Sequence, residues 1–195
     1  DHAGFLTTTF TDAGTDITLI NDKGYDACSY FFPDGKHLIW TSVRDKMGTS
    51  GKLEGDWSDW QHYPQGAELY ISDRQGGHVK RLTNNDYYEA EVTVSPDGKW
   101  IVFGRQIKGN MDLWVMNADG TGEHQITFTE DWQEGAPYFL PDSNTILFRA
   151  WKASEYGQRP TPMTIFTIKR DGSDLKEQTH THEMNWAPYP TPDGK

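Results

Sequence analysis

Four copies of a short proline-containing turn constrain what this chain can fold into. They occupy residues 32–36, 95–99, 140–144 and 191–195, and three of them read Pro-Asp-Gly-Lys after their first residue. Proline presets φ at the first turn position, aspartate bonds the backbone ahead of it, and glycine accepts the positive φ that follows. Each turn follows a run rich in β-branched or aromatic residues, and the first three also lead into one. The pattern predicts a β-hairpin that is used repeatedly.

A second turn marker alternates with the first. Asp-Gly-Thr at 119–121 and Asp-Gly-Ser at 171–173 match one another, and Gln-Gly-Gly at 75–77 is a degenerate copy. Each copy follows a segment of alternating apolar and polar residues, and each precedes a segment that ends in threonine. From that threonine to the next turn proline there are 13, 14 and 13 residues, so this half of the repeat is nearly constant in length. The threonines are Thr83, Thr127 and Thr179.

Two turns per repeat imply four strands, one leading into and one leading out of each turn. Four-stranded antiparallel units of this length predict an all-β protein with the β-propeller fold, in which stacked sheets cover one another's faces. A sandwich or a β-solenoid is the alternative. The predicted strands are 27–32, 37–42, 67–72 and 79–83, then 90–95, 99–104, 111–117 and 123–127, then 135–140, 145–150, 163–168 and 175–179.

The chain therefore divides into three complete blades and two partial ones within a single partial propeller spanning residues 1–195. The complete blades are 27–83, 90–127 and 135–179. Residues 4–26 are expected to belong to an earlier blade, with strands at 4–10 and 15–20, and residues 186–195 to begin the next one, with a strand at 186–191.

Composition narrows the range of partners. The formal net charge of −11 argues against binding nucleic acid through its phosphates and against an anionic membrane surface. The longest apolar runs have four or five residues, too short for a membrane span. Cys28 is the single cysteine, so an internal disulfide cannot form.

The repeats resemble those of the TolB-like propeller family. The match is nearly letter for letter at residues 95–103, 113–121 and 126–127. This family includes a periplasmic protein-binding module, and similar repeats form the propellers of prolyl-oligopeptidase-like enzymes and of oligogalacturonate lyase. The resemblance implies a periplasmic or secreted bacterial protein. It also implies a propeller of six or more blades, of which this chain would be a part.

Strand direction indicates where a site lies. Both turn types fall on one face of the predicted propeller. Two other kinds of connection fall on the opposite face: those that lead from one sheet into the first strand of the next, and those that join the second and third strands of a sheet. The large insertions, at 43–67 and 151–162, belong to the second kind of connection. Because loops on a rigid scaffold carry function, this face is the candidate surface.

One position on that face recurs seven residues before each turn proline. It holds Asp26, Glu89, Glu134 and Asn185, which are expected at the mouth of the central channel. Three carboxylates and an amide suit a hard divalent cation such as calcium, or a cationic group of a partner. The alternative is hydrogen bonding to the adjacent loop.

Aromatic and basic side chains accompany the acids. Tyr88, Trp132 and Trp186 suit sugar stacking or a peptide partner, or else packing between neighbouring blades. Arg149, at the end of a second strand, suits pairing with the acids or an ordinary ion pair. The candidate ligand-binding residues are therefore Asp26, Glu89, Glu134, Asn185, Tyr88, Trp132, Trp186 and Arg149.

No catalytic residue is assigned. The sequence has no Gly-x-Ser-x-Gly elbow and no His-Glu-x-x-His motif. His180 and His182 alternate as a weak metal pair would, but solvated loop histidines fit them better. The sequence thus favours a scaffold that binds a protein, a peptide or a carbohydrate. The alternatives are the propeller of a carbohydrate-active lyase or hydrolase, and the non-catalytic propeller of a larger peptidase-like enzyme.

Overall fold

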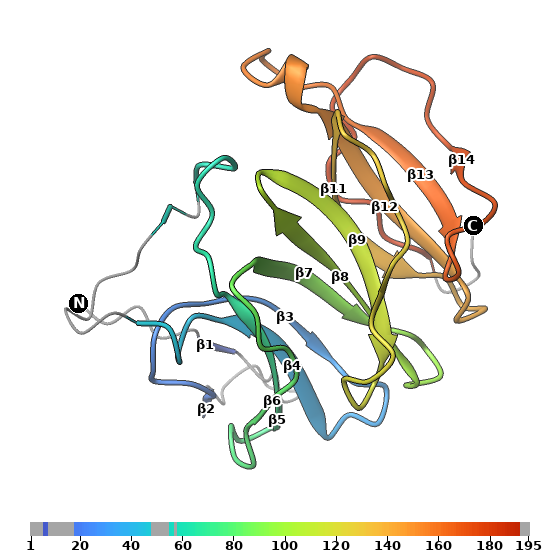
Figure 1. Cartoon of the computed structure of the whole chain (residues 1–195). Helices are drawn as coiled ribbons and strands as arrows, with labels where there is room; N and C mark the ends of the chain where they lie inside the picture. The colour runs from blue at the N-terminus through green and yellow to red at the C-terminus, as the bar shows by residue number, and fades with distance from the viewer. Residues whose placement is uncertain (1–5, 8–17, 48–54, 57, 192–195) are drawn as a thin grey trace. The chain divides into compact units, whose positions relative to one another are not determined.

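A computed structural model describes residues 6–7, 18–47, 55–56 and 58–191 of the chain. Strands dominate it, and the single helical element in the described part is a short 3-10 turn, η1 (Ala153–Glu155). No helix there is long and apolar enough to span a membrane. The chain forms two compact units, Asp1–Ala90 and Glu91–Lys195, and each is described by itself (Figure 1).

The first unit contains a strand pair and a four-stranded sheet. Leu6 of β1 pairs with Leu19 of β2 in antiparallel fashion. The larger sheet has the order β3-β4-β5-β6, and its neighbouring strands are all antiparallel. The strand bounds are β1 (Leu6–Thr7), β2 (Thr18–Leu19), β3 (Asp26–Phe31), β4 (His37–Ser42), β5 (Glu68–Asp73) and β6 (Lys80–Arg81).

Two further four-stranded sheets follow. Their orders are β10-β9-β8-β7 and β11-β12-β13-β14, and β7 spans the boundary between the two units. Figure 1 shows these sheets in green and orange. The bounds are β7 (Tyr88–Val94), β8 (Trp100–Ile107), β9 (Asn110–Asn117), β10 (His124–Gln125), β11 (Trp132–Phe139), β12 (Thr145–Lys152), β13 (Thr164–Lys169) and β14 (Lys176–Glu177).

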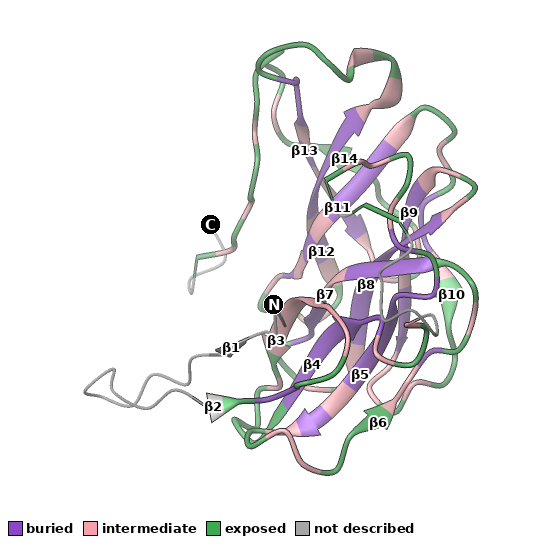
Figure 2. Cartoon of the chain, turned by 90° about the vertical axis from the view of Figure 1, so that its left-hand side faces the viewer, coloured by how far each residue is buried: buried purple, intermediate pink, exposed green. Residues whose placement is uncertain are grey.

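The core of the second unit lies between these two sheets. β11 packs against β8 and β9. Val102 and Leu113 from one sheet join Ile146 and Phe148 from the other in one buried cluster. The middle strands β8 and β9 are buried along most of their length, as Figure 2 shows in purple. Stacking thus covers faces that a single four-stranded sheet would leave in water, and each buried large apolar side chain contributes about 1.5–3 kcal/mol.

The Pro-Asp-Gly turns have the predicted chemistry. The Asp34 carboxylate accepts a hydrogen bond from the Lys36 N–H at 2.8 Å, and Gly35 has a φ of 63°. In the third copy, Ser143 takes the same positive φ (54°) without being glycine, so the turn geometry tolerates the substitution. The fourth copy extends over residues 192–195, which lie outside the described residues.

The repeated threonine has a structural role that the sequence did not indicate. The hydroxyl oxygens of Thr83, Thr127 and Thr179 accept the N–H of Leu69, Leu113 and Ile165, at 2.9, 2.8 and 3.0 Å. Each of these N–H groups belongs to the third strand of a sheet. The threonine hydroxyl therefore replaces a backbone carbonyl as the partner of the third strand, and the backbone pairing of the fourth strand ends there. This explains why β6, β10 and β14 are each two residues long, shorter than predicted.

The first strand of each sheet contains an irregularity near its middle. Cys28, Glu91 and Ala136, each five residues before a turn proline, have φ values of 48°, 54° and 48°. In β3 and β11 the register shifts at this point, so that one extra residue is accommodated. This is a β-bulge, repeated at one position of the repeat.

The last described segment differs from its prediction. A strand was expected at 186–191, and the structure assigns none to those residues. An isolated parallel bridge joins Met163 to Met184, and the Tyr189 ring lies 5.1 Å from that of Tyr138 in β11. The segment thus lies against the third sheet without joining a ladder.

The threonine contact makes a stability prediction. Replacing Thr127 with Val keeps the shape of the side chain but leaves the buried Leu113 N–H without an acceptor. We expect Thr127→Val to lower the free energy of unfolding by about 1–3 kcal/mol, measured by urea denaturation. Thr181→Val, at an exposed position, is the control and should change it little. Equal effects of the two substitutions would contradict the role assigned to the Thr127 hydroxyl.

Candidate functional site

Three of the four residues predicted at the channel mouth lie where a sheet begins. Asp26 is the first residue of β3, and Glu89 and Glu134 are the second and third residues of β7 and β11. Asn185 directly follows the Met163–Met184 bridge. Asp26 and Glu89 belong to the first unit, and Glu134 and Asn185 to the second.

The two acids of the first unit accept hydrogen bonds from asparagine side chains. The Asn21 amide donates to both Asp26 carboxylate oxygens, at 2.8 and 2.7 Å. Burial raises the pKa of the Asp26 carboxyl, and the hydrogen bonds from Ser42 and Asn21 oppose that rise. Glu89 is fully buried, and its Oε1 accepts the Asn85 amide at 2.8 Å. In both cases the donor comes from the connection that precedes the strand.

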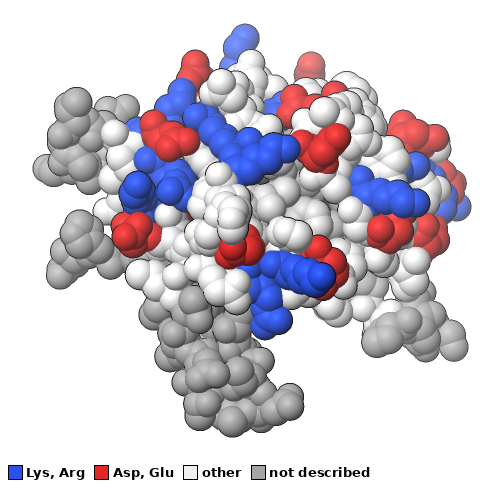
Figure 3. All heavy atoms as spheres, turned by 90° about the horizontal axis from the view of Figure 1, so that it is seen from below, with Lys and Arg blue, Asp and Glu red and all other residues white. Residues whose placement is uncertain are grey.

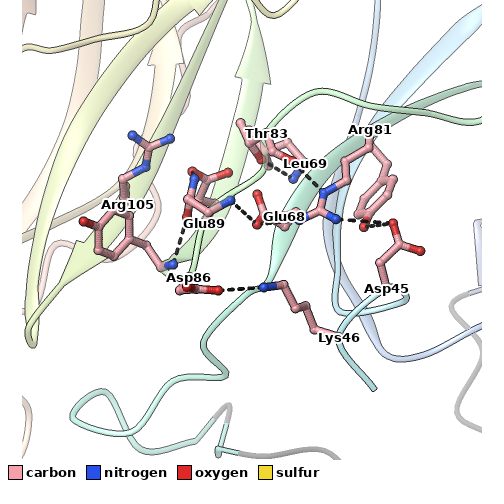
Figure 4. A network of polar contacts seen from close by, with 12 residues as sticks. Asp45, Lys46, Glu68, Leu69, Arg81, Thr83, Asp86, Glu89 and Arg105 are labelled. Atoms are coloured by element: carbon pink, nitrogen blue, oxygen red, sulfur yellow. Dashed lines mark hydrogen bonds and ion pairs between the residues drawn. The ribbon is translucent and has the colours of Figure 1, made fainter. Parts of the chain in front are cut away.

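Asn85 joins Glu89 to a larger polar network that includes Glu68, Arg81 and Thr83, which Figure 4 labels. Its backbone N–H donates at 2.6 Å to Oε1 of Glu68, a fully buried residue at the start of β5. The same oxygen accepts the Arg81 guanidinium at 2.8 Å. Arg81 further donates through Nε to the Thr83 carbonyl at 2.7 Å. The network thus links two buried carboxylates, Glu68 and Glu89, through the loop after β6.

The long connection at 43–67 is attached to the start of β7, as far as its residues are described. Lys46 pairs with Asp86 at 2.6 Å, and the Gly66 N–H donates to the Tyr87 carbonyl at 2.7 Å. The Tyr63 and Tyr88 rings stack with their centroids 4.5 Å apart. Tyr88 is 5% exposed, so its ring is buried where it packs against the connection. Its neighbour Tyr87 is 38% exposed.

Glu134 has a different environment from Glu89. Its side chain is 3% exposed, and its Oε1 accepts the Thr129 hydroxyl. Among the described residues its Oε2 has no hydrogen-bond partner. Burial raises the pKa of the Glu134 carboxyl to about 8, and the nearby Asp112 carboxylate adds to the rise. Glu134 is therefore largely protonated near neutral pH.

Trp132 precedes Glu134 by two residues and takes part in an aromatic group. Its ring meets that of Phe166 edge to face, with centroids 5.5 Å apart. The Lys152 ammonium lies 5.2 Å from the Trp132 ring centroid. Trp132 thus combines a packing role with a partly exposed surface.

Arg149 and Trp186 are brought together. The Arg149 guanidinium carbon lies 4.7 Å from the centroid of the Trp186 ring, which is 57% exposed. The guanidinium donates to Oε1 of Glu91 at 2.8 Å, while the Ala136 N–H donates to Glu91 Oε2 at 2.6 Å. The carboxylate that Arg149 meets is therefore that of the bulge residue Glu91, a functional candidate that the sequence reasoning missed.

Asn185 makes a backbone contact. Its amide donates to the Met163 carbonyl at 2.8 Å. This bond holds the last described segment at the entrance to β13, which begins at Thr164.

The histidines form pairs with single carboxylates. His180 lies 3.1 Å from Glu177, and His182 lies 3.9 Å from Glu155. Within the described part of the chain, no group of three or more His, Cys, Asp or Glu side chains could hold a metal ion. On the face drawn in Figure 3, Lys and Arg lie next to Asp and Glu.

Comparisons with known proteins place the chain in a fold and a family. It matches the Dipeptidyl peptidase IV (DPP IV) N-terminal region over residues 45–142, half of its length. TolB from Acinetobacter baumannii superposes with a TM-score of 0.67 at 16% identity, covering 93% of this chain and 39% of that one. The β-propeller domain of the Trilobed protease from Pyrococcus furiosus gives 0.52 at 14% identity, covering 80% and 43%.

A curated relative extends the comparison by sequence. The uncharacterized protein Atu1656 of Agrobacterium fabrum is 24% identical over 166 residues, which is 80% of this chain and 49% of that protein. The chain thus spans about half the length of this relative. The three sheets and the structural neighbours define a β-propeller with a TolB-like fold. The chain belongs to the family of the dipeptidyl peptidase IV N-terminal region.

The Glu134 environment makes the stability depend on pH. Its pKa is about 8 in the folded state against an ordinary value of 4.5, so the folded state binds its proton more tightly. The tighter binding of this proton contributes fully to the free energy of unfolding below pH 4.5, and the contribution is lost as pH rises toward 8. One pKa unit corresponds to about 1.4 kcal/mol; allowing for relaxation around the charge, we expect a loss of roughly 3 kcal/mol.

Glu134→Gln isolates this contribution. The variant keeps the hydrogen bond from Thr129 but cannot ionise, so it should be more stable than the native chain at pH 8 and similar to it at pH 5. Urea denaturation of both proteins at the two pH values measures the difference, and other carboxyls cancel because both proteins contain them. A difference that does not change between pH 5 and pH 8 would contradict the raised pKa.

Proposed function

We propose that this chain is part of an extracytoplasmic, periplasmic or secreted TolB-like propeller that binds a protein or peptide. The binding surface consists of two kinds of connection: those that enter the first strand of a sheet and those between its second and third strands. Asp26 and Glu89 in the first unit, and Glu134 and Asn185 in the second, lie at the end of the first kind. Tyr88, Trp132, Trp186 and Arg149 support or border them.

The observation that carries this proposal is the way the connections are held. The described residues of the long insertion are attached to the start of β7 and the two residues before it by the Lys46–Asp86 pair, the Gly66–Tyr87 backbone bond and the Tyr63–Tyr88 stack. These contacts hold the described residues of the insertion in place before any partner arrives, so that binding costs less conformational entropy. It also presents an exposed aromatic ring, that of Tyr87, of the kind that contributes most at protein interfaces.

The second unit offers a comparable element. Trp186 is 57% exposed, and its ring is oriented by the Arg149 guanidinium, which is itself fixed by Glu91. An aromatic ring held in this way and exposed on one side suits contact with a peptide.

The test uses a random peptide library displayed on phage and selected against the chain. Peptides that bind should lose at least tenfold in affinity toward Tyr87→Ala or Trp186→Ala, since exposed aromatic residues are common interface hot spots. Phe31→Ala is the matched control, because Phe31 is 41% exposed at the end of β3, beside the first Pro-Asp-Gly turn. Selection of no peptide, or of peptides that lose affinity only with Phe31→Ala, would overturn the proposal.

A second candidate follows from the family match to residues 45–142. Under it, the chain belongs to the non-catalytic propeller of a larger peptidase-like enzyme. The product of the complete gene would then cleave a dipeptidyl p-nitroanilide, whereas the 195-residue chain would not. A complete product that fails to cleave such substrates would reject this second candidate and leave the binding proposal standing.

A further inference from the structure

A cavity of about 380 Å³ lies in the second unit, beside the core between its two sheets. Residues 126–129, which follow β10, line one side of it. Side chains from the four strands of the last sheet line the other side, with Trp132, Phe148 and Phe166 forming an aromatic wall. Cavities of about 300–1,000 Å³ with mostly apolar walls are typical of small-molecule sites.

The three aromatic rings of this wall pack against one another in defined orientations. The Phe148 and Phe166 rings are stacked with centroids 5.6 Å apart, and Trp132 meets Phe166 edge to face. Phe128, which is 76% exposed, and Leu175, which is 52% exposed, also line the cavity, so it reaches the protein surface. Ligands can therefore enter without unfolding of the core.

Two buried polar residues, Thr127 and Glu134, line this otherwise largely apolar space. Glu134 is 3% exposed, its Oε1 accepts the Thr129 hydroxyl, and its Oε2 has no hydrogen-bond partner in the described part of the chain. A buried carboxyl oxygen without a partner is costly. Because Glu134 also lines the cavity, a cationic ligand bound there can pair with its carboxylate.

The charged residues around the cavity favour a ligand with a positive charge. The charged residues that line it are Glu134 and, from β14, Glu177, and the Asp112 carboxylate on β9 acts on Glu134 from the neighbouring sheet. His180 pairs with Glu177, and Lys152 lies over the Trp132 ring without lining the cavity. Acidic groups and aromatic faces both attract cations.

We propose that this cavity binds a small aromatic molecule that carries a protonated amine. The ring of the ligand packs against Trp132, Phe148 and Phe166, and its ammonium group pairs with the carboxylate of Glu134. This goes beyond the proposed peptide-binding surface: it is a small-molecule site between two sheets, although Glu134 and Trp132 contribute to both.

Proton release accompanies binding in this arrangement. In the free protein, burial raises the pKa of the Glu134 carboxyl to about 8. An ammonium group beside the carboxyl favours its ionised form and lowers that pKa. Between pH 6 and 7.5, binding therefore expels the Glu134 proton, and affinity rises close to tenfold per pH unit while the amine stays protonated.

Isothermal titration calorimetry with three indoles tests the site on the intact chain. Tryptamine is the cationic probe, 3-ethylindole the neutral one and indole-3-propionate the anionic one. We expect tryptamine to bind with one-to-one stoichiometry and to tighten close to tenfold from pH 6 to pH 7. The neutral probe should bind at least tenfold more weakly at pH 7.5 and without dependence on pH, and the anion should not bind.

Variants separate the site from general effects. Glu134→Gln should lose at least tenfold in tryptamine affinity together with its pH dependence, while Glu183→Gln, at an exposed acid outside the cavity lining, should change neither. Ala150→Leu fills part of the cavity and should abolish binding, with circular dichroism reporting whether it folds. Failure of tryptamine to bind, equal binding of the neutral indole, or unchanged binding by Glu134→Gln would overturn the proposal. None of these outcomes bears on peptide selection, so the two proposals can fail separately.

Discussion

The passage from one sheet to the next depends on a hydrogen bond from a side chain to a buried carboxylate. After the threonine that ends one sheet, the residue two positions on donates to the acid that opens the next: Asn85 to Glu89, and Thr129 to Glu134. The threonine itself accepts a backbone N–H of the third strand. Together the two contacts fix the end of one sheet and the entry into the following one, with few residues between them.

The same position in the repeat nevertheless has two chemical characters. Asn85 connects Glu89 to a network in which the Arg81 guanidinium pairs with the Glu68 carboxylate. Glu134 has a single hydroxyl donor, a carboxylate neighbour in Asp112 and aromatic surroundings, and its pKa rises to about 8. Equivalent acids in a repeat protein therefore need not share a role. The surrounding side chains, which differ from one repeat to the next, decide between an ion-pair network and a protonated, hydrogen-bonding acid.

Much of the architecture could be predicted because it depends on local signals. Proline, aspartate and glycine in sequence specify the turns, and alternating residues specify the second and third strands to within one to three residues. The acids at the starts of β3, β7 and β11 were identified by their spacing from proline. The Arg149–Glu91 pair and the cavity beside Glu134 could not be predicted in this way, because they depend on side chains from different strands that meet only after folding. The bulges were hidden as well, since Cys28, Glu91 and Ala136 are not residues that usually indicate a positive φ.

The bulge has a consequence for the strict spacing of seven residues between acid and proline. In β11, the two residues between Gly135 and Tyr138 lie opposite the single residue between Arg149 and Leu147, so the alternation of faces is reversed once along the strand. On one face of the sheet, the side chains come from odd-numbered positions on one side of the bulge and from even-numbered positions on the other. The acid therefore points to its observed face only because one extra residue lies between it and the turn. Loss of that single residue would leave the turn intact and turn the carboxyl to the other side of the sheet. Length, more than residue identity, is what this stretch of each repeat has to preserve.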